Sequence, residues 1–463
     1  MLKRMSVPAP QGLPQVEGQD YSQPPPSPTY EESAPSKEDE EKGNTSSNDE
    51  AEAYLVRWEP DDKENPRNWP FSLKVWCSFV LSMLALAASL GSSIVAPAEP
   101  VIAEYVHNAA AVFLTRFFAG VFGSAPVANV SAALGDMWEP KVRGTAMSLY
   151  AVCVVGGPTL GPTIGAALVV NKHLGWRWTE YIEAIWVFVT VILAYFAMPE
   201  MYAPVLLKKK AQRLRKETGN SAWYHPHERM KLDPKTIVTK HFTRPILMLT
   251  TEPMVTLIAL YASFVFALLY LTLEAFPIVF QENRGWGPVV GSTPFLGLFV
   301  GVIFALGVNL ANQPRYRRIS EAHKGKPVPE ARLPPMIVGG FLFAIGLFWF
   351  GWTADPKIHW ILPVIAGVFI GAGFNIIFQQ CINFLVDTYG RYAASATSAN
   401  TLLRSALAAV FPLVARPMFH NLGPGRAMSI LGAIACAAIP VPFLFMKYGA
   451  ALRRKSKFAP VDE

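Results

Sequence analysis

Charged residues and cysteine are both scarce in this chain. Of its 463 residues, 16% are Asp, Glu, Lys or Arg, whereas soluble domains carry about 25%. The four cysteines, Cys77, Cys153, Cys381 and Cys436, lie in apolar segments, which argues against a disulfide framework or a zinc site. The eight histidines are scattered and show no metal-ligand spacing. We therefore expect no metal and no cofactor.

Motifs for enzymatic chemistry are also missing. The sequence has no glycine-rich phosphate loop followed by lysine and no Ser/His/Asp constellation suited to nucleophilic catalysis. His225 and His227 flank a proline in a basic stretch, but no third ligand accompanies them. We expect no enzyme and no nucleic-acid partner, with an intramembrane enzyme as a weak alternative. No cleavable signal peptide opens the chain, so the first membrane helix is expected to direct insertion.

Apolar residues, in contrast, are abundant. The chain is 51% hydrophobic and 12% aromatic, with a mean hydropathy of +0.26. A membrane helix needs roughly 20 apolar residues. The expected fold class is therefore an all-α membrane bundle with four spans before a long basic segment and six after it. The ten predicted spans are 75–97, 109–132, 144–169, 181–198, 246–272, 290–311, 335–353, 359–385, 394–418 and 426–447.

Composition divides the chain into five parts. Residues 1–53, rich in Pro, Ser, Glu and Asp, predict a disordered tail because they bury too little apolar surface to fold. They precede a shortened N-terminal helical half (54–200), a basic loop (201–245), a six-helix C-terminal half (246–450) and a tail (451–463). Because basic residues concentrate on the cytoplasmic side of membranes, we expect the basic loop and both termini to be cytoplasmic.

Glycine and proline gather inside one uncharged apolar stretch, which reads GGPTLGPTIGA from Gly156 to Ala166. Membrane helices tolerate both residues because neighbouring helices satisfy the freed backbone groups. Small residues also let two helices approach closely. Two interpretations are open, a helix-packing face and a functional motif. The candidate motif residues are Gly157, Pro158, Gly161, Pro162 and Gly165.

This stretch resembles the GPxxGG antiporter signature of the major facilitator superfamily, with Ala166 at the place of the second glycine. ENPRNW (64–69) and FLTRFFAGVFGSAP (113–126) resemble, respectively, the segment before the first helix and the fourth helix of fungal multidrug transporters. The resemblance covers almost everything after residue 54 and is closest to the twelve-helix drug:proton antiporters. It implies two halves related by internal pseudo-symmetry.

Two helices of that family have no counterpart here. Residues 92–105 resemble the outer end of the first helix and 113–126 the fourth, so that 106–112 leave no room for the second and third. Three explanations are open: a truncated gene model, a deletion in a decaying gene, and a functional ten-helix variant. The alternative to a transporter is therefore a non-transporting membrane paralogue.

The resemblance implies a function and a location. It implies efflux of drugs, toxins or secondary metabolites by proton antiport, through alternating access of a central cavity. We expect an amphipathic or cationic small-molecule substrate, with protons and the lipid bilayer as the other partners. We also expect a monomer in the cell membrane.

Charged side chains inside the predicted spans are few, and a charge at the bilayer centre costs about 2.5–3.5 kcal/mol on insertion scales. Arg116 resembles the family's fourth-helix arginine, which is linked to proton coupling. Glu274 and Arg404 are further candidates for proton coupling or for the cavity. Structural alternatives stay open, because Arg116 has the length to snorkel outward and Glu274 falls near a helix end.

Polar residues without charge complete the candidates. Gln379 and Asn383 follow Asn375 at helical spacing, so they share one face and are candidates for lining a cavity. Bonding between helices is the more frequent use of such amides.

Two loops resemble the family's cytoplasmic gates. Asp136 and Arg143 lie in GDMWEPKVRG, and Asp387 and Arg391 lie at the corresponding place of the second half, in VDTYGRYAASA. The resemblance implies that each Asp–Arg pair latches helix ends. Ordinary charged loops are the alternative.

Overall fold

The computed structural model describes residues 54–106, 108–228, 242–323, 327–454 and 456–458. These residues form helices and one isolated β-bridge between Leu55 and Tyr224. The predicted disordered tail, 1–53, lies outside them, as do 229–241 of the basic loop and 459–463 of the C-terminal tail.

The N-terminal half holds four long helices among its described residues. The first of them ends at Leu90, earlier than predicted, where Gly91 and two serines follow and Pro97 supplies no backbone donor. Two short elements, η2 (Ala96–Ala98) and α3 (Glu99–Tyr105), then lead to Asn108, whose side chain accepts from the Ala111 N–H. The long helices are α2 (Phe71–Leu90), α4 (Ala109–Met137), α5 (Pro140–Val170) and α6 (Arg177–Ala197).

The C-terminal half begins with a helix broken in two. The predicted span 246–272 divides at Glu252, because Pro253 lacks an N–H and favours an extended residue before it. A π-helical turn, Ile278–Glu282, follows the short α11. The helices are α9 (Arg244–Thr251), α10 (Pro253–Leu273), α11 (Ala275–Pro277), α12 (Pro288–Ser292), α13 (Phe295–Ala322), α14 (Leu333–Thr353), α15 (Ile361–Tyr389), α16 (Ala393–Ala438) and α17 (Pro440–Arg454).

The predicted fold class, an all-α membrane bundle, is confirmed. The described residues contain nine helical stretches long and apolar enough to cross a membrane, and the last of these is Ala393–Arg454. Within α16, Gly423 has φ 76°, which a glycine adopts without steric cost and which breaks the helix. This break divides the last stretch into two, so that the described residues contain four apolar stretches before the basic loop and six after it, as the sequence predicts.

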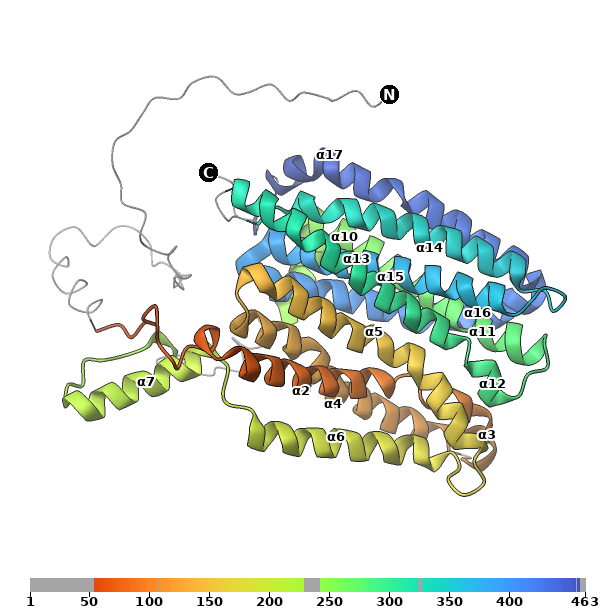
Figure 1. The fold of residues 1–463 in the computed structure, drawn as a ribbon, viewed down its shortest axis with the longest axis horizontal. Coiled ribbons are helices and arrows are strands. Elements are labelled where there is room, and N and C mark those ends of the chain that lie inside the picture. Colours follow the sequence, from red (N-terminus) through yellow and green to blue (C-terminus); the bar gives the residue numbers. More distant parts are fainter. Residues whose placement is uncertain (1–53, 107, 229–241, 324–326, 455, 459–463) are drawn as a thin grey trace. The chain divides into compact units, whose positions relative to one another are not determined.

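The helices run side by side between two ends of the bundle (Figure 1). We call the end where α4 ends and α5 begins the basic end, because α7 (Ala203–Thr218) with its lysines and arginines follows α6 there. The opposite end carries α3 and α12 (right in Figure 1). The Lys210 ammonium lies 2.6 Å from the Asp62 carboxylate, and Arg213 pairs with Glu64, so α7 is tied to the segment that precedes α2.

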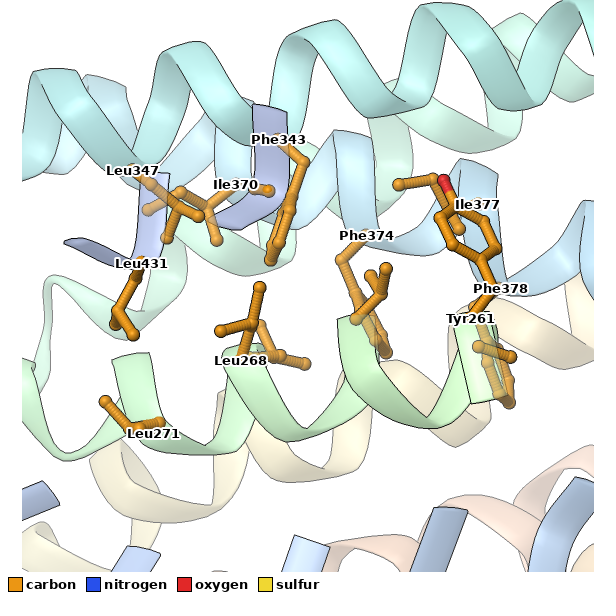
Figure 2. Packing of buried hydrophobic residues seen from close by; sticks show 14 of the residues in the cluster. Tyr261, Leu268, Leu271, Phe343, Leu347, Ile370, Phe374, Ile377, Phe378 and Leu431 are labelled. Carbon is orange, nitrogen blue, oxygen red and sulfur yellow. The ribbon is translucent and has the colours of Figure 1, made fainter. Parts of the chain in front are cut away.

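The largest apolar cluster lies in the C-terminal half. Figure 2 shows Phe343 and Leu347 of α14 and Ile370 of α15 above Leu268 of α10. Lipid tails are as apolar as these side chains, so close packing rather than transfer from water holds such helices together. Glycine allows it: a Cβ added to Gly339 of α14 would lie 3.0 Å from a backbone oxygen of α15.

Candidate functional site

A cavity of about 390 Å³ lies between the two halves. The end of α2 and the middle of α5 form its wall on the N-terminal side, and α10, α15 and α16 form the wall on the C-terminal side. Most of its lining is apolar or small, including Val154, Leu269, Leu273 and Ala408. A cavity of this size accommodates a small organic molecule.

Arg404 of α16 is the charged residue in this lining. Its guanidinium carbon lies 4.5 Å from the centroid of the Phe266 ring and 4.9 Å from that of Phe378, in the range of cation–π attraction. Its Nε is buried without a hydrogen-bond partner among the described residues. The titratable groups that face it are the phenols of Tyr150 and Tyr270, not carboxylates. The predicted candidate Arg404 thus lies in the cavity.

Four aromatic rings form one wall of the cavity. Phe266 stacks on Tyr270 with ring centroids 4.8 Å apart, and Phe374 stacks on Phe378 at 5.7 Å with an interplanar angle of 11°. Phe266 joins the two pairs, at 5.7 Å from Phe374 and 5.9 Å from Phe378. Both α15 rings lie on the side that faces α10 (Figure 2). They stand one turn apart on α15, which their spacing of four residues dictates.

Hydroxyl groups form the polar part of the lining. Ser89, at the end of α2, donates to the Val154 carbonyl of α5, and Ser92 donates to the Ser89 carbonyl at 2.7 Å. Thr159 donates to the Gly156 carbonyl of its own helix at 2.9 Å. These hydroxyls keep their lone pairs as acceptors. The N-terminal wall therefore offers weak polar contacts and no charge.

The glycine motif of α5 packs against the end of α2. A Cβ on Gly157 would lie 2.6 Å from the Leu90 nitrogen, and one on Gly161 would lie 2.9 Å from the Ile94 nitrogen. A Cβ on Gly165 would overlap with the Ile94 carbonyl. The three glycines therefore form the predicted packing face, and any role of the motif in antiport stays a prediction.

The two motif prolines lie inside α5. Pro158 lines the cavity and Pro162 lies one turn further on. Beyond it, Thr163 donates to the Ser292 carbonyl of α12 at 2.8 Å, which joins the two halves at the opposite end.

Arg116 lies outside the cavity. It pairs with Glu180 of α6, and its side chain remains 35% exposed. Its other guanidinium nitrogen lies 3.5 Å from the Gly91 carbonyl of α2, and the Glu183 carboxylate packs against Gly91 as well. Arg116 thus joins α2, α4 and α6 near the opposite end, and its predicted role in proton coupling stays a prediction.

Glu274 lies at the end of α10, next to the cavity residue Leu273. Its carboxylate is 4.0 Å from Arg416 of α16, and both side chains are partly exposed. One turn along α16, His420 contacts Glu282 at 3.0 Å. Two pairs, each of an acidic and a basic side chain, thus tie the segment from the end of α10 to the π-helical turn to α16.

The predicted amide stripe is buried but does not line this cavity. Gln379 is 5% exposed and Asn383 is 8% exposed, on a side of α15 next to the aromatic rings. Their neighbour Gln380 donates to Asn309 of α13 at 2.8 Å. Among the described residues, amides of this part of α15 thus make a contact between helices.

Asp387 forms a buried network at the basic end. Its carboxylate accepts from Arg332 at 2.9 Å and from the Tyr316 hydroxyl at 2.8 Å, and the Asp387 and Arg332 side chains are 6% and 9% exposed. The Arg332 guanidinium also lies 3.5 Å from the Tyr316 ring. The sequence predicted Arg391 as the partner of Asp387, but the Arg391 side chain lies outside the described positions.

Asp136 and Arg143, the corresponding candidates of the N-terminal half, are arranged differently from Asp387 and its partners. No ion pair joins them in the described part of the chain, although the Arg143 side chain lies 3.9 Å from the Cβ position of Gly135. The next residue, Gly144, packs directly against the Gln313 side chain of α13, whose nearest carbon would lie 2.9 Å from an added Cβ. This contact joins the two halves at the basic end.

Sequence reasoning missed Arg332 and the aromatic wall. Arg332 had a weak signal, since it is the last charge before the apolar run of α14. Phe266 and Phe378 had none, because phenylalanine is frequent throughout this chain and nothing in the sequence marks which rings meet.

Comparison with known proteins identifies the family of this chain. The family model described as Major Facilitator Superfamily matches residues 74–412. Transporter C36.02c of Schizosaccharomyces pombe, itself uncharacterized, is 38% identical over 89% of this chain and 81% of its own. The multidrug transporter FLU1 of Candida albicans is 36% identical over 89% and 77% of the two chains. The efflux pump bik6 of Gibberella fujikuroi is 38% identical over 88% and 96%. The chain belongs to the major facilitator superfamily, in its multidrug-type branch, a family of transporters rather than enzymes.

Proposed function

We propose that this protein exports small amphipathic molecules from the cell by proton antiport. The observation that carries the proposal is the cavity between the halves, with an aromatic wall and Arg404 as its charged group. The relatives described as a multidrug transporter and an efflux pump support the direction of transport. The substrate is a drug, a toxin or a secondary metabolite.

Alternating access fits the contacts between the halves. Thr163 and Ser292 meet at the opposite end, while Gly144 and Gln313 meet at the basic end. The cavity lies between α2, α5, α10, α15 and α16, so rocking of one half would open the contact at one end and keep the contact at the other. Among the described residues neither of these two contacts contains an ion pair, so opening it leaves no unpaired buried charge.

Proton coupling is assigned to Glu274. Protonation of its carboxylate would remove the attraction to Arg416 and loosen the tie between α10 and α16. Both helices contribute cavity residues, so the change would reach the binding site directly. Arg116 and Glu180 would act as a second charge pair within the N-terminal half.

Orientation follows from the basic residues. The basic end carries α7 and the end of α13, whose arginines include Arg315, Arg317 and Arg318. Positive residues concentrate on the cytoplasmic side, so the basic end faces the cytoplasm and the opposite end faces outward. The protein would act as a monomer in the cell membrane.

The test is export by the full chain in cells that lack their own multidrug exporters. Cells expressing it should retain less of at least one fluorescent dye from a panel of anionic, neutral and cationic compounds. Ala408→Trp fills the cavity and should abolish export. Leu413→Trp, on the same helix with a side chain 76% exposed, is the matched control and should keep it. Equal dye retention in cells with and without the protein would refute the proposal, provided that the protein is detected at the cell surface.

A non-transporting paralogue is the second candidate, and one observation favours it. The alignment with the C36.02c transporter has 467 positions, more than this whole chain of 463 residues, although it uses 89% of the chain. Several tens of positions of the relative therefore face gaps here, enough for two membrane helices of about 20 residues. Sequencing of transcripts across the codons for 106–112 decides whether the message itself encodes the missing pair.

A further inference from the structure

The charge of the cavity is unbalanced. Arg404 is the charged member of its lining, and the described residues supply no carboxylate that pairs with it. The groups that surround its guanidinium are two phenylalanine rings and two tyrosine hydroxyls. An arginine stays protonated at any physiological pH. The cavity lining therefore carries one positive charge.

Such a charge is costly without a counterion. Arg404 is half-buried and its Nε is fully buried, so the guanidinium has lost part of its hydration, and aromatic rings return only a fraction of that free energy. An anion that enters the cavity would compensate for this loss of free energy, because charge-assisted hydrogen bonds to guanidinium are about twice as strong as neutral ones. A cation would meet repulsion from Arg404 and, among the described lining residues, no carboxylate to attract it.

The shape of the site indicates which class of anion it would bind. A guanidinium presents a planar fork of donors that matches a carboxylate. The rings of Phe266, Tyr270, Phe374 and Phe378 lie beside it and offer a surface on which a flat ring can stack. Hydroxyls stand on the N-terminal wall, where they contribute neutral polar contacts.

We propose that this cavity is a binding site for an aromatic carboxylate, held by Arg404 through its acid group and by the Phe266–Phe378 wall through its ring. The inference rests on the proposed export function and specifies its substrate class. Of the amphipathic or cationic substrate that the family resemblance implies, it keeps the amphipathic character and replaces the positive charge by a negative one.

The test uses three probes with the same ring and different charge: 1-naphthoic acid, 1-naphthamide and 1-naphthylmethylamine. Binding of each to the purified full chain in detergent at pH 7.5, near neutrality, is measured by isothermal titration calorimetry. The carboxylate should bind about tenfold or more tighter than the amide, because it gains charge-assisted bonds to Arg404. The amine should bind most weakly. An amine that binds as tightly as the carboxylate, or no preference between acid and amide, overturns the inference.

Variants assign the preference to Arg404. Arg404→Gln should remove the preference for acid over amide and leave amide binding nearly unchanged, which also shows that the variant is folded. Arg404→Lys should restore some of the preference, since it keeps the charge and loses the planar fork. Arg426→Gln, an exposed arginine elsewhere on α16, is the matched control and should keep the full preference. If Arg404→Gln does not fold, the test rests on two other results: the affinity ranking of the three probes on the unaltered protein, and the preference for acid over amide in Arg404→Lys.

The proposal on binding and the proposal on export can be rejected independently of each other. Preference for the acid without export by cells would keep this inference and reject the proposed function. Export of cations together with tight amine binding would keep the function and reject the inference.

Discussion

In the C-terminal half, 67% of the most apolar stretch of α10 is buried, and the same share of α15. In the N-terminal half the share is 6% for α6, and no described residue of the corresponding stretch of α4 is buried. All four helices are nevertheless long and apolar enough to cross a membrane. Hydropathy thus identifies a span in either half, whereas burial depends on which neighbours each helix has.

The difference identifies where partners are missing. α14 packs along α15 through glycine contacts such as Gly339 against the Gly373 carbonyl, so the C-terminal half closes around its own core. α4 carries phenylalanines at positions 113, 117, 118 and 122 that remain exposed within the protein. Two further helices, expected between 106 and 112 from the family resemblance, would pack in this half.

The largest effect should come from the ion pair of the C-terminal half. Asp387→Asn leaves the buried Arg332 without its counter-charge, which costs about 3–5 kcal/mol. Asp136→Asn, at the corresponding place in the N-terminal half, breaks no ion pair in the described structure and should cost about 0.5 kcal/mol or less. Chemical unfolding in detergent measures both. Equal losses in the two variants would contradict the contrast between the halves.

A smaller effect should come from a tight helix contact of the N-terminal half. Gly165→Ala forces a methyl group against the Ile94 carbonyl and should cost about 1–3 kcal/mol through overpacking. Gly120→Ala, on α4 with nothing within 4 Å of the new methyl, should leave stability unchanged or raise it slightly. A fluorescence-based thermal scan of both variants tests the pair. If both lose stability equally, α2 and α5 do not pack as described.

The smallest effect concerns the segment that links the halves. Burial raises the pKa of the Asp62 carboxyl, but the hydrogen bonds from Lys210 and the Glu64 backbone outweigh it, so the pKa lies below its ordinary value. The pair therefore stabilises the fold above the unfolded pKa of about 4 and loses this contribution as the pH falls below it.

Lys210→Gln should then cost about 1 kcal/mol or less near neutral pH, and the difference from the unaltered protein should shrink as Asp62 becomes protonated. Lys209→Gln, at the exposed neighbouring position, is the control and should show no such pH dependence. A difference that grows toward acid pH would show that the carboxylate of Asp62 is not the partner.

The sequence predicted the spans and the family because both depend on local pattern. Runs of about 20 apolar residues identify helices directly, and the glycine spacing in α5 identified a face that the structure confirms as a packing surface. It also predicted Arg404 as a candidate, since a charge inside an apolar span is rare enough to single out.

What escaped prediction depends on contacts between distant segments. The Arg332 partner of Asp387 lies 55 positions away. Phe266 and Phe378 meet Arg404 from two other helices, and chain pattern does not select them among many phenylalanines. The broken helix at Glu252 is an intermediate case, because Pro253 indicates a break but not that Glu252 is fully buried.

The most direct test of export is transport by the purified chain of 463 residues, reconstituted into proteoliposomes. A pH gradient, acid inside, is imposed across vesicles loaded with buffer, and uptake of 1-naphthoic acid and of 1-naphthamide is followed. Proton antiport predicts that the gradient drives accumulation of at least one probe, that dissipating the gradient with an ionophore abolishes it, and that Ala408→Trp does not accumulate it. Equal uptake with and without the protein, for a preparation that still binds the probe, would show that this ten-helix chain binds ligands but does not transport them.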